Sequence, residues 1–176
     1  MATVTKPYIK PRSSWNASAP TSSMTRMYSV NNLVIHHSEA VQHEGTGDAA
    51  ARSVKSIQEW HQGSSNGWAD IGYHYLISVD GQIFEGRDIN YQGAHVENNN
   101  QNKIGICCLG NYMSKPISGL QHNSLVKLLA WLLQQYGGTI VGHRDVGSSN
   151  CPGDSLYAQK PQIIKDAFAL LGIYES

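Results

Sequence analysis

Two histidines and one cysteine are spaced so that they could bind a metal ion together. His36 follows the apolar run 33–35, His143 follows the run 139–142, and Cys151 lies eight residues after His143 in a loop. Two imidazoles and one thiolate are typical of a zinc site whose fourth position is open, and zinc lowers the pKa of a water there to about 7. The sequence has no short ligand motif such as His-Glu-x-x-His. The three residues alone therefore also fit two ordinary buried histidines and a small buried cysteine.

These residues need a sheet and helices to bring them together, and the hydrophobic pattern predicts both. The predicted strands cover residues 33–36, 73–77, 83–85, 104–109 and 139–141, with an Asp-Gly hairpin turn at 80–81. The predicted helices begin at Asp48, Ser118 and Pro161. Strands that alternate with helices, together with one hairpin, predict a single α/β domain in which helices flank a central mixed β-sheet.

The length of the chain and its first segment indicate one domain with an irregular start. The 176 residues, 40% of them hydrophobic, fit one compact unit, which at this size buries roughly 70% of its unfolded surface. Residues 1–30 show no period and predict an N-terminal arm packed on the domain, with Trp15 as its anchor. Residues 31–176 then form the domain that holds the metal site, and the long polar segment 86–103 is of a kind that often carries function.

Charge balance and cysteine count disfavour several classes of protein. The 13 Lys and Arg residues equal the 13 Asp and Glu residues, which disfavours a strongly basic nucleic-acid binder. The longest apolar stretch, 125–133, is far shorter than a membrane span. Three cysteines cannot form a disulfide framework, and Cys107 and Cys108 would point to opposite faces of a strand. We expect a monomer with no nucleic-acid partner and no membrane insertion.

Several motifs, taken in order, resemble the zinc-dependent N-acetylmuramoyl-L-alanine amidases of type 2, a family that includes peptidoglycan-recognition proteins and amidase-type phage lysozymes. The matching segments are 12–17 (Arg-Ser-Ser-Trp-Asn-Ala), 34–38 (Val-Ile-His-His-Ser), 70–77 (Asp-Ile-Gly-Tyr-His-Tyr-Leu-Ile), 85–87 (Glu-Gly-Arg), 92–95 (Gln-Gly-Ala-His), 102–106 (Asn-Lys-Ile-Gly-Ile), 142–146 (Gly-His-Arg-Asp-Val) and 151–153 (Cys-Pro-Gly). The resemblance implies zinc as cofactor, with His36, His143 and Cys151 as its ligands. It implies hydrolysis of the amide between N-acetylmuramic acid and L-alanine of peptidoglycan.

The resemblance also implies two catalytic side chains. Tyr73 matches a tyrosine that donates a hydrogen bond to the developing oxyanion or holds the attacking water. One branch of the family has a glutamate base where this chain has Cys107, so the tyrosine branch is the better match. Ser149 lies where catalytic relatives often have Lys or Thr. A serine donates a hydrogen bond but brings no positive charge, so we expect weaker stabilisation of the transition state.

Four further residues are candidates for substrate binding, each with an ordinary structural alternative. His37 either borders the site or packs behind the ligand His36, and His95 is either a cleft residue or a surface histidine. Arg87 either pairs with a carboxylate of the stem peptide or braces its loop, and Trp68 either stacks on substrate or packs in the core. The other histidines match no functional motif: His43, His61 and His122 are expected at surface or helix positions, and His74, in a strand beside Tyr73, is expected to have a structural role.

The favoured interpretation is an enzyme that lyses or remodels the bacterial cell wall. A recognition module that binds muramyl peptides without cleaving them is the alternative, and the retained Cys151 and Tyr73 favour catalysis. Binding of a regulatory protein is a further alternative for which the sequence carries no sign. No secretory signal is visible, and residues 38–60 lack the cysteine of secreted animal relatives. These features favour a phage or bacterial enzyme made in the cytoplasm that acts on the wall, with a secreted protein that has lost its signal as the alternative.

Overall fold

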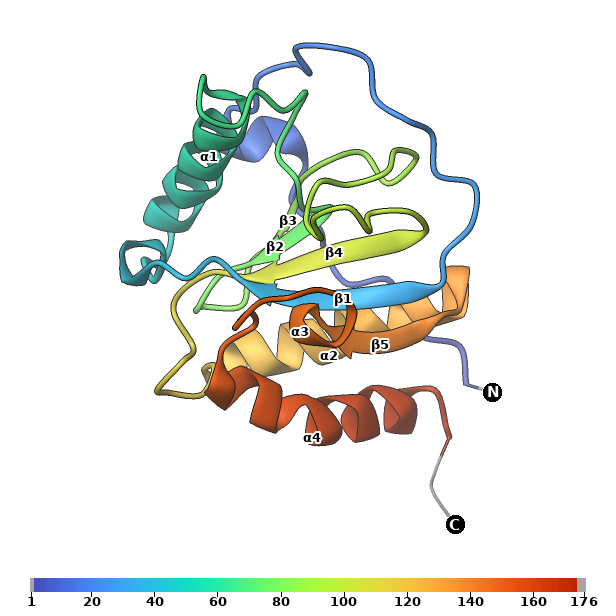
Figure 1. Cartoon of the computed structure of the whole chain (residues 1–176). Coiled ribbons are helices and arrows are strands. Elements are labelled where there is room, and N and C mark those ends of the chain that lie inside the picture. Colours follow the sequence, from blue (N-terminus) through green and yellow to red (C-terminus); the bar gives the residue numbers. More distant parts are fainter. Residues whose placement is uncertain (1, 174–176) are drawn as a thin grey trace.

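The apolar runs form the strands of one mixed sheet in the computed structural model, which describes residues 2–173 (Figure 1). The strands are β1 (Asn32–His37), β2 (Tyr75–Ile77), β3 (Ile83–Glu85), β4 (Lys103–Cys108) and β5 (Thr139–Gly142). Their order is β3-β2-β4-β1-β5. β1 runs parallel to β4 and β5, β2 runs parallel to β4, and only the β2–β3 hairpin is antiparallel. The predicted fold class is confirmed.

Helices cover both faces of this sheet (Figure 1). α1 (Asp48–Gln62) lies on one face, and α2 (Gly119–Tyr136) and α4 (Asp154–Leu170) lie on the other. α3 (His143–Val146) is one turn that follows β5 directly, and the 3-10 turns are η1 (Arg12–Trp15) and η2 (Val41–His43). Within residues 2–173, no helix combines the length and the apolar character that crossing a membrane requires.

Each face of the sheet has its own hydrophobic core, because successive side chains of a strand point to opposite faces. The core beside α1 includes Val54, Ile57, Leu76, Phe84, Cys107 and Leu109. The core beside α2 and α4 includes Leu33, Ile35, Ile106, Cys108, Leu125 and Leu129. Cys107 and Cys108 therefore face opposite layers, as predicted, and both are free thiols.

Two predicted element boundaries need comment. α2 begins as predicted, with the Ser118 hydroxyl accepting a hydrogen bond of 3.0 Å from the Gln121 N–H. The predicted start of the last helix at Pro161 is wrong, because α4 begins at Asp154 and contains Pro161. The Tyr112 carbonyl accepts hydrogen bonds from the free N–H groups of Ser155 and Leu156 in the first turn. That distant partner stabilises an early start which local sequence does not reveal.

Residues 10–15 pack against the edge strand β3 and end in the turn η1. Trp15 of η1 is 2% exposed, which confirms its packing role, and its indole N–H donates to the Glu85 carbonyl at 2.8 Å. Arg12 forms an ion pair with the buried Asp70 at 2.9 Å. Lys10 bonds to the backbone of β3. These contacts hold the start of the chain against β3 and the segment that precedes β2.

Candidate functional site

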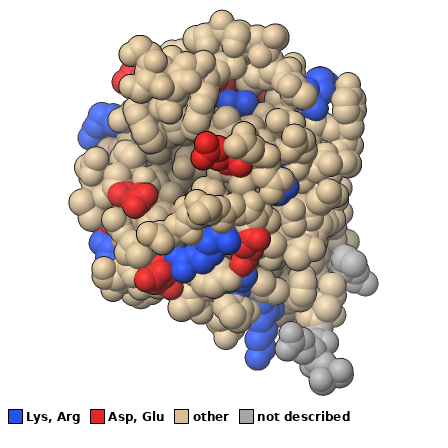
Figure 2. Space-filling view, in the orientation of Figure 1, with Lys and Arg blue, Asp and Glu red and all other residues tan. Residues whose placement is uncertain are grey.

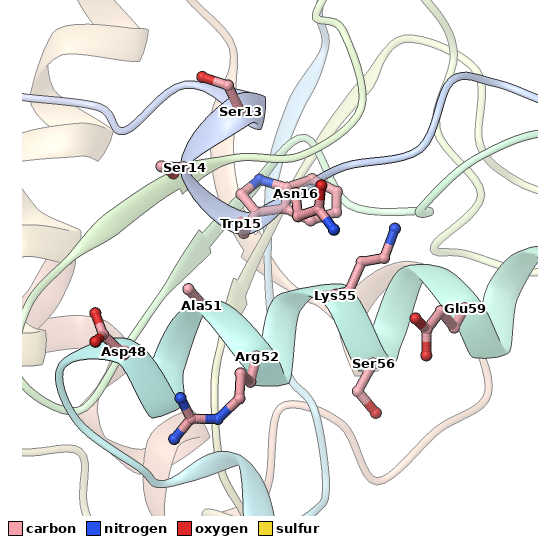
Figure 3. Close-up of a pocket in the computed structure, with 10 residues that line it drawn as sticks. All are labelled: Ser13, Ser14, Trp15, Asn16, Asp48, Ala51, Arg52, Lys55, Ser56 and Glu59. Carbon is pink, nitrogen blue, oxygen red and sulfur yellow. The ribbon is translucent and has the colours of Figure 1, made fainter.

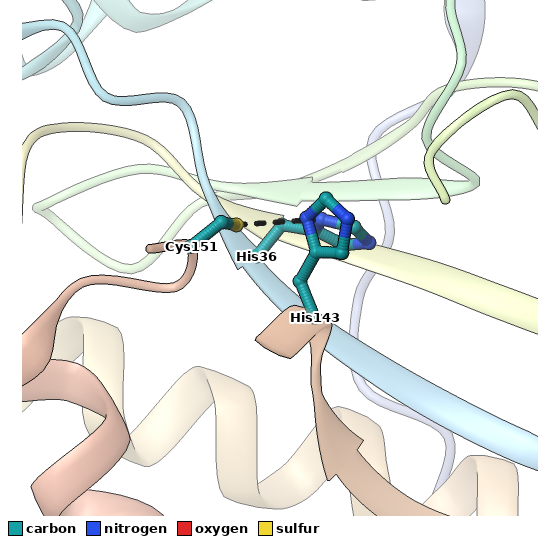
Figure 4. A group of neighbouring side chains, drawn as sticks. All are labelled: His36, His143 and Cys151. Atoms are coloured by element: carbon teal, nitrogen blue, oxygen red, sulfur yellow. Dashed lines mark hydrogen bonds between the residues drawn. The ribbon is translucent and has the colours of Figure 1, made fainter. Parts of the chain in front are cut away.

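The parallel sheet brings the two predicted histidine ligands to one edge. Ile35 of β1 pairs with Gly142 of β5, so the next residues, His36 and His143, are neighbours. Their ring centroids lie 4.7 Å apart. Cys151 approaches from the loop after α3, and its Sγ lies 3.5 Å from His36 Nδ1 (Figure 4). One ligand atom from each of the three residues falls within 4.8 Å of the others.

The electrostatic environment of these three residues suits a divalent cation. Burial, with the neighbouring His95 and His143, holds the pKa of His36 well below its usual value, and burial also lowers the pKa of His143. Both rings are therefore neutral at pH 7 and offer a nitrogen lone pair. Burial raises the pKa of the Cys151 thiol to about 12, so the protein alone does not favour the thiolate. A cation held here would supply the missing charge, and the donor set of two imidazoles and a sulfur fits zinc.

Backbone hydrogen bonds hold Cys151 in place. Its carbonyl accepts from the Arg144 N–H at 3.0 Å, and its sulfur lies 3.4 Å from the His37 N–H. The Ser149 hydroxyl accepts from the Cys151 N–H at 3.0 Å. Ser149 itself is exposed, and its side chain braces the ligand loop.

A cleft of about 580 Å³ is lined by His143 and by two neighbours of His36, Tyr73 and His95. Its residues come from the end of α1, the segment before β2 and the segment before β4, and include Trp60, His61, Trp68, Tyr73, His95, Glu97, Asn98, Asn100 and His143. One wall is aromatic and the other is rich in asparagine. Figure 2 shows this face of the molecule hollowed and sparsely charged, and among the described lining residues Glu97 is the one charged side chain.

Tyr73 and Cys107 lie directly beside His36. The Tyr73 ring centroid is 5.1 Å from that of His36, and Cys107 is paired with His36 across β1 and β4. Burial, together with the nearby Cys107 and Cys151 thiols, raises the pKa of Tyr73 well above its usual value. The phenol therefore keeps its hydrogen at neutral pH and acts as a hydrogen-bond donor.

The four predicted substrate-binding residues fall into two groups. His95 and Trp68 line the cleft. His37 faces the opposite side of the sheet, where its Nδ1 accepts from the Tyr112 N–H at 3.1 Å. Arg87 is buried away from the cleft, and its guanidinium donates to backbone carbonyls of the segments that flank it, at 2.8 to 3.0 Å. In the structure, Arg87 therefore holds together the segments whose carbonyls it contacts.

One histidine of the cleft was not a sequence candidate. His61 lies in the last turn of α1 on its buried face, 3% exposed. Its ring centroid is 4.5 Å from that of Trp68 and 5.7 Å from that of Tyr73, with the rings tilted. Its Nδ1 accepts from the Gly72 N–H at 2.9 Å, which leaves Nε2–H to donate. His61 follows Ile57 by four residues, so the helical period indicates that both side chains lie on the buried face of α1. Nothing in the local sequence indicates that this end of α1 meets the segment before β2.

A second hollow lies between η1 and α1, away from this cleft. Figure 3 shows its lining, which is largely polar and includes Asp48, Arg52, Lys55 and Glu59 along α1. None of the metal-ligand, catalytic or substrate-binding candidates lines it. The candidate site is therefore the cleft beside His36.

Known proteins are similar to this chain in sequence and in fold. A sequence profile described as N-acetylmuramoyl-L-alanine amidase matches residues 26–154. Peptidoglycan-recognition protein SC2 of Drosophila simulans is 37% identical over 150 residues, 83% of this chain and 80% of that protein. The endolysin of Enterobacteria phage T3 is 37% identical over 109 residues, 58% of this chain and 71% of the phage protein. The solved structure of peptidoglycan recognition protein-LE in complex with tracheal cytotoxin, a monomeric diaminopimelic acid-type peptidoglycan, has a TM-score of 0.80 at 30% identity and covers 88% of this chain and 92% of that chain.

Proposed function

Because the chain belongs to the N-acetylmuramoyl-L-alanine amidase family, we propose that it hydrolyses the amide between N-acetylmuramic acid and L-alanine in peptidoglycan. The observation that carries the proposal is the convergence of His36, His143 and Cys151 within 4.8 Å. Structural elements far apart in the chain bring these three residues together beside a cleft. The complex of peptidoglycan recognition protein-LE with a peptidoglycan fragment supports the same substrate class.

The two histidines and the cysteine would hold a zinc ion. Bound there, zinc would polarise the amide carbonyl and activate a water molecule for attack on it. The cleft supplies binding: its aromatic wall, formed by Trp60, His61 and Trp68, offers flat faces for sugar rings and apolar side chains. Its asparagines supply amide donors and acceptors for a peptide backbone.

Tyr73 performs the hydrogen-bonding step in this proposal. Its phenol lies beside His36 and keeps its hydrogen, so it donates to the oxygen that gains negative charge as the amide carbon becomes tetrahedral. Ser149 is exposed beside the proposed ligand Cys151, and its hydroxyl accepts from the Cys151 N–H. It contributes mainly by holding the ligand loop, with a donor hydrogen available to substrate.

The proposal is tested by two measurements on the purified chain. Metal analysis should find one zinc per chain, and incubation with purified peptidoglycan should release new L-alanine amino termini. Cys151→Ser removes the sulfur donor, so it should lose zinc and activity together. Cys108→Ser is the matched control, because it changes a buried thiol that faces the core beside α2 and α4 and is not among the three proposed ligands.

Two results would contradict the proposal. Wild-type chain that binds no zinc would remove the metal mechanism. Chain that binds zinc and muramyl peptide but releases no amino termini would establish the recognition module instead.

A further inference from the structure

A chain of two hydrogen bonds leads from a backbone carbonyl to the ligand histidine His36. His36 Nε2 lies 2.8 Å from His95 Nδ1, and His95 Nε2 lies 3.3 Å from the Lys103 carbonyl oxygen. Both rings are buried, at 1% and 8% exposure. The other nitrogen of His36, Nδ1, is the one that faces Cys151.

The carbonyl at the end of this chain determines where the ring hydrogens lie. A carbonyl oxygen only accepts, so His95 carries its hydrogen on Nε2 and its Nδ1 keeps a lone pair. That lone pair accepts from His36, which therefore carries its hydrogen on Nε2. With the reverse arrangement, His95 Nε2 would set a lone pair against the carbonyl oxygen. His36 is left with an unprotonated Nδ1 that faces Cys151, the form a metal ligand needs.

Backbone hydrogen bonds and two neighbouring glycines fix the position of the His95 ring. The Asn100 side-chain oxygen accepts from the backbone N–H of His95 at 2.8 Å and from the backbone N–H of Val96 at 2.7 Å. A Cβ on Gly105 would lie 2.7 Å from Cγ and Cδ2 of the His95 ring, and a Cβ on Gly93 would lie 2.5 Å from the same Cδ2. Because both positions are glycine, the ring can lie close against β4 within reach of His36.

We propose that His95 is a positioning residue that holds His36 in the Nε2–H tautomer and so presents Nδ1 for zinc. The proposal rests on the proposed function for its metal, but the tautomer is a property of the metal-free chain. Partners of this kind behind a ligand histidine typically contribute about 10- to 100-fold to metal affinity.

Two variants of His95 test the role of its acceptor atom. In His95→Leu no acceptor remains, whereas in His95→Asn the amide oxygen stands near the place of Nδ1. Long-range ¹H–¹⁵N spectra of the metal-free chain report the tautomer of His36, with His36→Gln to assign its signals. Competition with a chromophoric chelator measures the zinc Kd. His122→Leu is the control for loss of an imidazole, because His122 of α2 pairs with Asp166 of α4 and both helices lie on the face of the sheet opposite α1.

The expected result is an Nε2–H His36 in wild type, a mixture of tautomers in His95→Leu, and zinc binding weakened about 10- to 100-fold there. His95→Asn should recover most of the loss, and His122→Leu should match wild type. A wild-type His36 with its hydrogen on Nδ1 overturns the proposal, and so does a His95→Asn variant as weak as His95→Leu. If His95→Leu does not fold by circular dichroism, the tautomer and Kd of His95→Asn decide alone. A wild type without zinc affinity rejects the proposed function, while the spectra still decide the tautomer.

Discussion

The chemistry proposed for Tyr73 depends on one hydroxyl of a half-buried side chain that lines the cleft. The ring lies against His36, and burial raises the pKa of the phenol, so the group donates and is not a base. Cys107 stands where a glutamate base occurs in one branch of the resembling family. Burial raises the pKa of this thiol as well, so Cys107 is no substitute for that base. Within the proposed reaction, Tyr73 is therefore the donor on which the transition state depends.

Tyr73→Phe should lower kcat by about 10²- to 10³-fold, the usual cost of removing one oxyanion donor. Its zinc content should not change, because the phenol is not among the proposed ligands. Release of L-alanine amino termini and metal analysis are the measurements. Tyr75→Phe is the matched control, since Tyr75 packs in the core beside α2 and α4. Full activity in Tyr73→Phe would remove the residue from the mechanism.

At the scale of elements, the single turn α3 presents His143 and depends on one carboxylate. Asp145 accepts from the Gly142 N–H at 2.8 Å, forms an ion pair with Lys160 at 2.6 Å and accepts from the Tyr157 hydroxyl at 2.6 Å. Desolvation opposes ionisation, but the hydrogen bonds from Lys160, Tyr157 and Gly142 outweigh it and lower the pKa of Asp145. The carboxylate thereby ties the end of β5 to α4.

Asp145→Asn keeps an oxygen that can accept from the Gly142 N–H but removes the negative charge that pairs with Lys160. It should therefore destabilise the protein by about 0.5 kcal/mol at pH 7, as is usual for a partly exposed ion pair. Because the pKa of Asp145 is lowered by folding, its contribution is present above the unfolded value of about 3.9 and disappears as the pH falls below it. Urea unfolding at pH 7 and pH 3 measures both effects. Asp154→Asn, at an exposed carboxylate that pairs with Arg144, should show a smaller change. An equal loss in both variants at pH 7 would contradict the role of Asp145.

At the scale of the whole molecule, buried neutral histidines link folding to pH. Burial lowers the pKa of His61 and of His74 to about 4. Both rings are tied to backbone: His61 accepts from Gly72, while His74 accepts from Gly105 and donates to the Tyr91 carbonyl. The unfolded chain takes up these protons near pH 6.5, whereas the folded chain does so only near pH 4. Protons in that interval therefore favour unfolding.

The free energy of unfolding of the metal-free chain should fall as the pH drops from 6.5 to 4, by up to about 3 kcal/mol for each such histidine. Urea unfolding across this range measures the slope. His61→Gln should have a shallower slope than wild type, and His122→Gln, at a partly exposed histidine, should keep most of it. An identical slope in His61→Gln and wild type would contradict the prediction.

The sequence by itself determined the layers of this fold and the three residues that converge as a candidate metal site. Strand and helix periods depend on neighbours a few residues apart, so they indicated the sheet, the Ser118 cap and the opposite faces of Cys107 and Cys108. His36 and His143 follow strands, and parallel strands end at the same edge of a sheet. The triad was therefore accessible before the structure, while spacing alone left ordinary histidines as an alternative.

Tertiary structure decided everything that depends on partners distant in the chain. The Tyr112 carbonyl starts α4 at Asp154, seven residues before the predicted Pro161. Hydrogen bonds to backbone carbonyls hold the Arg87 side chain away from the cleft. The end of α1 places His61 among the residues that line the cleft. The bond from His95 to His36 joins residues 59 positions apart. A local sequence pattern indicates on which face of a helix or strand a side chain lies. Only tertiary packing determines which atoms that side chain contacts there.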